Sequence, residues 1–147
     1  MPIVQEAAKK PIDTWIQPFY ETALKHLKGE TIQTEKWSTP ETTLTGTARK
    51  LYLQGAEIYR REGHCITCHQ ENGQGLPAAQ FPPLAESEWV SGDRNRLIKL
   101  TLHGLLGPIK VKGVAYQGLV PMTPFKGLSN EELASVLTYV RNSFGNE

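Results

Sequence analysis

The chain has 147 residues and a formal net charge of +1. This length suits one domain with some additional residues and is enough to bury a core. The near-neutral charge argues against a nucleic-acid-binding protein, which would carry a marked basic excess. No stretch is long and apolar enough to span a membrane, and the first residues lack the apolar core of an export signal.

Residues 1–47 are predicted to form an N-terminal arm, one helix and a linker. Apolar side chains recur at i, i+3 and i+4 over residues 18–28, as in an amphipathic helix, and Gly29 supplies a stop signal. The Thr-rich stretch 30–47 has the composition of a linker. We expect residues 48–147 to form the main domain.

Two cysteines and a histidine form the stretch Cys65-Ile66-Thr67-Cys68-His69. A C-x-x-C-H string is the signature of c-type haem attachment. Cys65 and Cys68 would form thioethers with the two vinyl groups of the porphyrin, and His69 would bind the iron as its proximal ligand. A redox-active cysteine pair and half of a zinc site are alternatives. Neither is favoured, because no βαβ pattern precedes Cys65 and there is no third cysteine.

This type of haem attachment takes place outside the bacterial cytoplasm, so we expect a periplasmic or other extracytoplasmic location. Because no export signal is visible, we interpret the chain as a mature or excised piece whose signal, or an entire upstream domain, is missing. No disulfide is expected, since haem attachment uses both cysteines.

Several elements follow from local patterns in the main domain. A helix over residues 48–61 leads into the haem motif. Gly55 inside it indicates the close approach of another helix, because glycine costs a helix about 1 kcal/mol relative to alanine. Residues 72–84 are predicted to form a loop and residues 94–102 a helix. Alternating apolar side chains over residues 109–116 indicate a small β-hairpin.

The last helix has the clearest boundaries. Ser129 and Glu132 have the spacing of a capping box, with Ser129 as the N-cap. Apolar side chains then repeat along one side, with Tyr139 beside them, and Gly145 is predicted to end the helix. A first helix with Gly55 and a last helix with Tyr139 can cross, because the glycine admits the aromatic ring. The sequence thus predicts an all-α fold with one small hairpin.

Haem iron has a second axial position, for which we favour Met122. Prolines on both sides stiffen an extended loop that can project its thioether toward the iron, and methionine ligation would raise the reduction potential relative to two histidines. His103 is the second choice. The remaining candidates are less suitable by position: Met1, His26 and His64.

A ligating histidine usually donates its other ring N–H to a carbonyl. We expect the carbonyl of Pro82 to accept this hydrogen bond and Leu84 to line the face of the haem. Four side chains are possible partners of the haem propionates: Trp89, Arg94, Arg96 and Tyr116.

Together these residues resemble the class I, single-haem cytochrome c family over about residues 51–146. The resemblance consists of Gly55 and Tyr59 in the first helix, the C-I-T-C-H motif, the Pro82-Pro83-Leu84 turn, the Met122 loop and residues 137–141. It implies a compact helical fold around one covalent haem with an exposed edge. The protein would then be an electron-transfer domain and not itself an enzyme.

A closer resemblance concerns residues 62–84, 103–105 and 120–125. They are similar to the C-terminal cytochrome c domain of large dehydrogenase-like proteins of planctomycete-type bacteria. Residues 140–146 are also similar to cytochromes that serve alcohol dehydrogenases and haem-fused nitrite reductases. This implies a redox protein, or a fused dehydrogenase or reductase domain, as partner. A haem-based sensor or enzyme binding gas or peroxide through a labile sixth ligand is the alternative function, and residues 1–45 as a docking module are a third.

Overall fold

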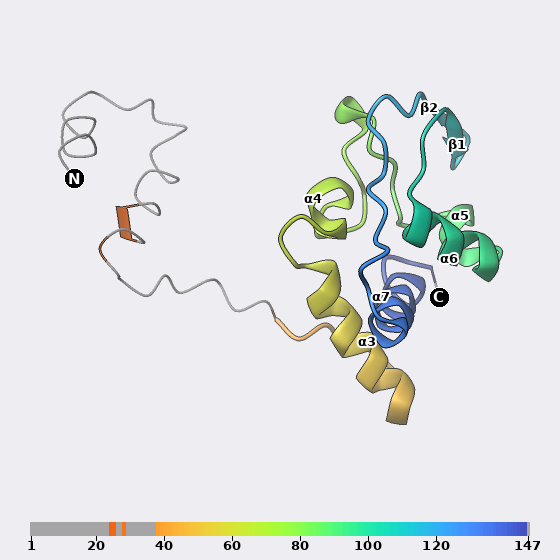
Figure 1. Cartoon of the computed structure of the whole chain (residues 1–147). Helices are drawn as coiled ribbons and strands as arrows, with labels where there is room; N and C mark the ends of the chain where they lie inside the picture. The colour runs from red at the N-terminus through yellow and green to blue at the C-terminus, as the bar shows by residue number, and fades with distance from the viewer. Residues whose placement is uncertain (1–23, 26–27, 29–37, 147) are drawn as a thin grey trace. The chain divides into compact units, whose positions relative to one another are not determined.

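The computed structural model describes residues 24, 25, 28 and 38–146 (Figure 1). The chain divides into two compact units, residues 1–38 and 39–147. The helix predicted over residues 18–28 therefore lies largely outside the described residues, and so does most of the predicted linker. None of the described helices is long and apolar enough to cross a membrane.

The second unit is mostly helical, with one two-stranded antiparallel sheet (Figure 1). Its fold class is therefore confirmed. Three short helices, α4, η1 and α5, were not predicted. In chain order the elements are α3 (Gly46–Tyr59), α4 (Cys65–His69), η1 (Pro77–Ala79), α5 (Glu88–Ser91), α6 (Arg94–His103), β1 (Ile109–Val111), β2 (Val114–Tyr116) and α7 (Asn130–Arg141).

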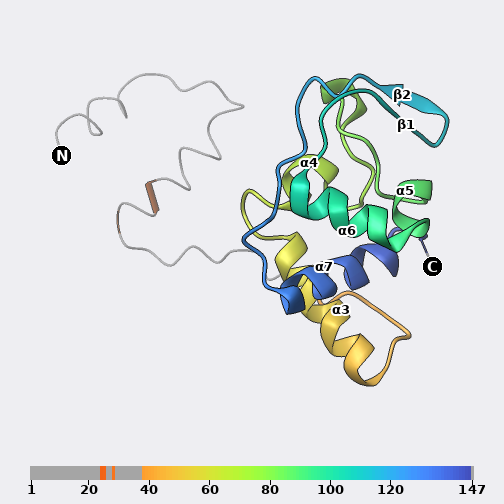
Figure 2. The same ribbon diagram turned by 45° about the vertical axis from the view of Figure 1, so that its right-hand side comes forward.

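Helices α3 and α7 cross in contact with each other, and both views show the crossing (Figures 1 and 2). Gly55 lies at this point. A Cβ atom there would overlap the backbone carbonyl of Ser135 and lie 2.7 Å from the Cβ of Tyr139. The predicted close approach at Gly55 is confirmed, and it explains why a residue with poor helix propensity stands inside α3.

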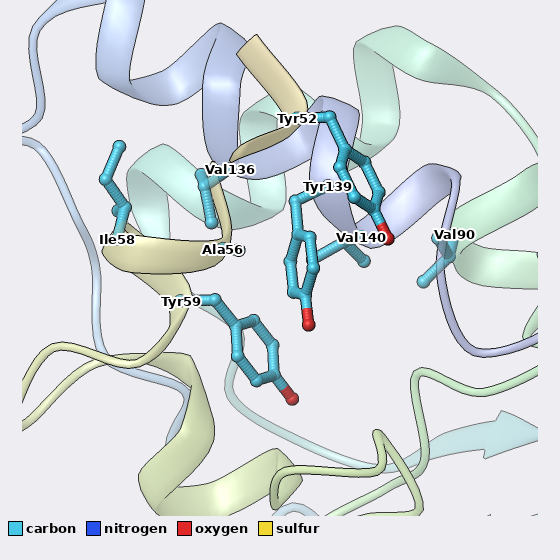
Figure 3. Close-up of a cluster of buried hydrophobic side chains, with 8 residues drawn as sticks. All are labelled: Tyr52, Ala56, Ile58, Tyr59, Val90, Val136, Tyr139 and Val140. Atoms are coloured by element: carbon cyan, nitrogen blue, oxygen red, sulfur yellow. The ribbon is translucent and has the colours of Figure 1, made fainter. Parts of the chain in front are cut away.

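An aromatic cluster fills the core between these helices (Figure 3). The ring of Tyr139 lies 5.2 Å from that of Tyr52, 5.3 Å from that of Tyr59 and 5.6 Å from that of Phe144. The Tyr59 hydroxyl donates a hydrogen bond of 2.6 Å to the carbonyl of Gln70. Burial raises the pKa of Tyr59 above its ordinary value, so the phenol stays protonated as a donor.

The N-terminal end of α7 is as predicted, with Ser129 and Glu132 forming a reciprocal capping box. Its C-terminal end is not at Gly145, because the helix ends at Arg141. The Thr138 carbonyl accepts from both the side chain of Asn142, over 2.8 Å, and its backbone N–H, over 3.2 Å, so Asn142 caps the C-terminal end of α7.

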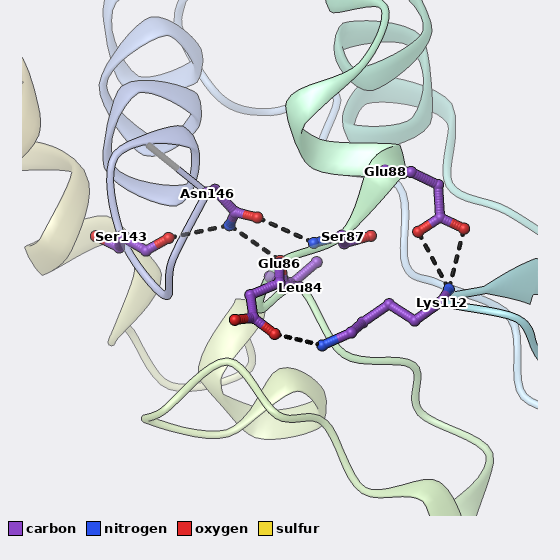
Figure 4. A network of polar contacts seen from close by, with 7 residues as sticks. All are labelled: Leu84, Glu86, Ser87, Glu88, Lys112, Ser143 and Asn146. Carbon is purple, nitrogen blue, oxygen red and sulfur yellow. Dashed lines mark hydrogen bonds and ion pairs between the residues drawn. The ribbon is translucent and has the colours of Figure 1, made fainter.

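The hairpin β1–β2 is confirmed, with Ile109 opposite Tyr116. Lys112 and Gly113 both have positive φ angles, 50° and 79°, as a two-residue hairpin turn of type I′ requires. The Glu88 carboxylate accepts from the Lys112 backbone N–H at 3.0 and 3.1 Å, and the Lys112 ammonium pairs with Glu86 at 2.7 Å (Figure 4). These contacts tie the hairpin to the segment that begins α5.

Residues 39–47, which the sequence assigns to the linker, belong to the same compact unit as the main domain. The carbonyl of Glu41 accepts a hydrogen bond of 3.3 Å from the Tyr52 hydroxyl, and Leu44 packs against the core. A linker composition therefore did not prevent residues 39–45 from packing against the haem domain, and residues 46 and 47 form the start of α3.

Candidate haem-binding site

Helix α4 consists of the motif itself and brings both cysteines and His69 into little more than one helical turn. Cys65 and Cys68 form no disulfide, and each is half-buried. Burial raises the pKa of the Cys65 thiol to about 11 and also raises that of Cys68. A redox-active pair needs a cysteine with a lowered pKa, so these thiols do not fit the thioredoxin-like alternative.

The side chain of His69 is buried, with 8% of its surface exposed. Its Nδ1 lies 2.9 Å from the carbonyl oxygen of Pro82. A carbonyl can only accept, so Nδ1 carries the proton. Burial lowers the pKa of the imidazole, and the bond to Pro82 offsets part of this effect. Nε2 then keeps a lone pair, for which the described residues supply no hydrogen-bond donor.

The backbone of Gly75 lies so close to the Pro82 carbonyl that no side chain fits at position 75. A Cβ atom at Gly75 would lie 2.6 Å from the Pro82 oxygen. The Gly75 N–H donates to the His69 carbonyl over 3.0 Å, so the same glycine contacts both partners of the Nδ1 hydrogen bond. Gly75 also has a φ of +67°, which disfavours other residues there.

Two adjoining cavities lie beside His69. Both are lined mostly by apolar side chains, as sites for small molecules and cofactors are. His69 and Met122 line both cavities, so the two side chains border the same space. The residues shared by both cavities are Cys65, His69, Pro82, Leu105, Ile109 and Met122.

The remaining predicted site residues fall into two groups. Tyr116 is buried and lines the first cavity, and Leu84 lines the second. Trp89 also lines the second, but its indole N–H already donates to the Lys110 carbonyl over 2.8 Å. Arg94 is exposed on α6 and lines neither cavity.

Arg96 is also on α6 and lies 4.6 Å from the centre of the Trp89 ring. Its guanidinium donates to the Glu88 carbonyl over 3.0 Å. These contacts join α5 to α6. They engage the Arg96 guanidinium, which the sequence had suggested as a partner of a haem propionate.

The candidates for the second axial position differ in whether they line a cavity. Met122 is half-buried and pairs through its backbone with Leu105 in an isolated antiparallel bridge. His103 is exposed and lines neither cavity. His64 lines the first cavity, with its ring 5.1 Å from that of Phe125. Met1 and His26 lie outside the described residues.

Sequence reasoning missed two apolar residues in the wall of both cavities, Leu105 and Ile109. A signal for Ile109 was present, because Ile109 and Val111 alternate with Lys110 in the predicted hairpin and so share one face. Leu105 carries no comparable pattern, since it follows the end of α6. Among residues 24, 25, 28 and 38–146, no group of three or more His, Cys, Asp or Glu side chains could hold a metal ion.

Comparison with known proteins identifies the class to which this site belongs. A cytochrome c family model matches residues 52–144. Cytochrome c-552 of Thermus thermophilus is 45% identical over 95 residues, which cover 62% of this chain and 68% of that protein. The cytochrome c subunit of the quinone alcohol dehydrogenase of Gluconacetobacter polyoxogenes is 32% identical over 96 residues, covering 65% of this chain and 19% of that subunit.

The fructose dehydrogenase cytochrome subunit of Gluconobacter japonicus is 28% identical over 93 residues, covering 63% of this chain and 19% of that subunit. The chain thus spans about two thirds of the Thermus protein but only about a fifth of each dehydrogenase subunit. The chain belongs to the cytochrome c family. Within it, the protein is a class I, single-haem c-type cytochrome that transfers electrons.

The residues present fit the covalently bound haem c of this family. Two thiols border the first cavity, the wall is mainly apolar, and the free Nε2 belongs to a side chain that lines both cavities. The haem supplies a one-electron iron couple. The chain would supply the two thiols, the histidine with the proton on Nδ1, and an apolar enclosure that limits water around the iron.

Proposed function

We propose that this cytochrome carries single electrons through a haem whose iron is bound by His69 and Met122. The observation that supports this most directly is that both side chains line both of the adjoining apolar cavities. A six-coordinate iron has no open position for a substrate. Its role is therefore to accept and release an electron through the exposed edge of the haem.

For the proximal side, the support is the tautomer of His69. Donation from Nδ1 to the Pro82 carbonyl leaves Nε2 as the atom that can bind iron. For the distal side, the support is the location of Met122 in the cavity wall, whereas the competing His103 is exposed. The neutral thioether would favour the ferrous iron and give a higher potential than a second histidine.

The test compares Met122→Ala with His103→Ala as a matched control. We expect the wild type and His103→Ala to show the absorption band of methionine–iron ligation at the red edge of the ferric spectrum, and Met122→Ala to lose it. A pyridine haemochrome spectrum reports the thioether attachment independently. An unchanged spectrum in Met122→Ala would exclude Met122 as the ligand.

Binding of carbon monoxide distinguishes electron transfer from the alternative of a gas or peroxide sensor. A stable sixth ligand makes carbon monoxide binding to the reduced protein slow, whereas Met122→Ala should bind it rapidly. Rapid binding by the wild type would instead favour a labile sixth ligand and the sensor function.

We further propose that the protein works outside the cytoplasm as a domain or partner of a dehydrogenase or reductase. The support is similarity to cytochrome subunits of alcohol and fructose dehydrogenases. The closer similarity to planctomycete-type dehydrogenase-like proteins remains a prediction. Residues 1–45 are the proposed docking module; because residues 39–45 belong to the compact unit of the haem domain, the test removes residues 1–38, which should weaken reduction by the partner and leave the reduction potential unchanged. A changed potential would make them part of the haem domain.

A further inference from the structure

The segment after α7 holds the loop that follows Pro82, and the side chain of Asn146 makes the main contacts (Figure 4). Its Oδ1 accepts from the Ser87 backbone N–H over 3.0 Å. Its Nδ2 donates to the Leu84 carbonyl, also over 3.0 Å. On the other side, Nδ2 lies 3.0 Å from the carbonyls of Val140 and Ser143. One amide therefore bridges the end of α7 and residues 84–87.

The loop depends on such contacts because Pro82 and Pro83 have no backbone N–H to donate. Before them, Phe81 is fixed by a two-way backbone pairing with Leu76, at 3.0 and 3.1 Å. After them, the first available donor is Leu84, which binds the Gly73 carbonyl over 2.8 Å. The Pro82 carbonyl is thus held from its two flanks and not by hydrogen bonds of the prolines themselves.

Asn146 completes the second flank. The Leu84 N–H donates to the Gly73 carbonyl, and the Leu84 carbonyl accepts from the Asn146 side chain. The Phe144 carbonyl adds one bond, accepting from the Glu86 N–H over 3.1 Å. If the amide of Asn146 is removed, the Leu84 carbonyl and the Ser87 N–H lose their partner, and the loop can shift relative to α4.

We propose that Asn146 is a positioning residue for the axial ligand His69. It fixes the loop so that the Pro82 carbonyl stays within 2.9 Å of Nδ1. The inference depends on the proposed ligation by His69. A strong bond from Nδ1–H to a carbonyl makes the imidazole a more basic ligand, which stabilises ferric iron. Weakening that bond should therefore raise the reduction potential.

The experiment compares Asn146→Ala with Asn142→Ala in the holoprotein. The Asn142 side chain donates only to the Thr138 carbonyl in its own helix, so it matches the chemical change without touching the loop. We expect Asn146→Ala to raise the midpoint potential and to accelerate exchange of the His69 Nδ1 proton in NMR spectra of the reduced protein. Asn142→Ala should change neither.

If Asn146→Ala does not retain haem, Asn146→Ser is measured in its place. The serine hydroxyl can replace some of the contacts of the amide. The midpoint potential should therefore rise, and the His69 Nδ1 proton should exchange faster, but both by less than in Asn146→Ala. A purely structural role predicts lower stability with unchanged potential and proton exchange, and that result overturns the inference. If the wild-type spectrum lacks histidine ligation, the proposed function itself fails, so the two failures can be told apart.

Discussion

Substitution of Gly55 by alanine should destabilise the protein, although alanine is the better helix former. In an isolated helix the change would gain about 1 kcal/mol. Here the new methyl group would overlap the carbonyl of Ser135, which is backbone and cannot rotate away. Helices α3 and α7 must therefore separate at their crossing.

The expected loss in the free energy of unfolding has two sources, overpacking at the crossing and weaker contacts of the Tyr139 ring. Forcing a methyl group into a packed core costs about 1–3 kcal/mol. Tyr139 also makes ring contacts with Tyr52, Tyr59 and Phe144, and such pairs contribute about 0.5–1.5 kcal/mol each. Partial loss of these contacts, offset by the gain in helix propensity, gives a net loss of about 2–4 kcal/mol.

Equilibrium unfolding in urea, followed by far-UV circular dichroism, measures this difference. Gly127→Ala is the matched control, because a Cβ atom there meets nothing within 4 Å and its φ angle is not positive. That substitution should be neutral or stabilise by up to about 1 kcal/mol. If Gly55→Ala unfolds at the same urea concentration as the wild type or a higher one, the close-packing argument is refuted.

Two further substitutions test polar contacts around the helices. Tyr59→Phe removes the donor to the Gln70 carbonyl and should lower the free energy of unfolding by about 1 kcal/mol; an unchanged value would mean that water replaces the phenol. At the start of α7, bonds from the Ser129 N–H and then from Arg61 lower the pKa of Glu132 from 4.5 to about 2. The stabilisation is therefore complete above pH 4.5 and disappears as the pH falls toward 2. Glu132→Gln should be less stable than the wild type at pH 7, with a difference that shrinks over this window, and a constant difference would contradict the assignment.

The sequence predicted those features that short patterns specify. The C-x-x-C-H motif constrains five neighbouring positions at once, and the capping box at Ser129 and the turn at Lys112–Gly113 each need only two residues. Gly55 was informative for the opposite reason, because it contradicts its local helix and so indicates a tertiary contact.

The short helix α5 was missed because distant residues stabilise it. Four residues are too few to show a helical period. Its first N–H groups are capped by Ser87, but its carbonyls at Val90 and Ser91 accept from Arg141 over 2.7 and 3.0 Å. An arginine about 50 positions away in α7 therefore satisfies the C-terminal end of α5. Nothing near residue 90 indicates this partner.

Partners that are distant in sequence are even harder to predict for the groups around His69. The proposed ligand His69 is recognisable by its side chain, but its hydrogen-bond acceptor is a backbone carbonyl, which every residue possesses. What distinguishes Pro82 is the packing around it, which Gly75 provides by lacking a side chain and Asn146 by bridging two segments. Substitutions that alter the potential without altering the cavity wall should therefore fall at such positions. The motif specifies which cofactor is bound, whereas on our proposal contacts between distant segments adjust the reduction potential of its iron.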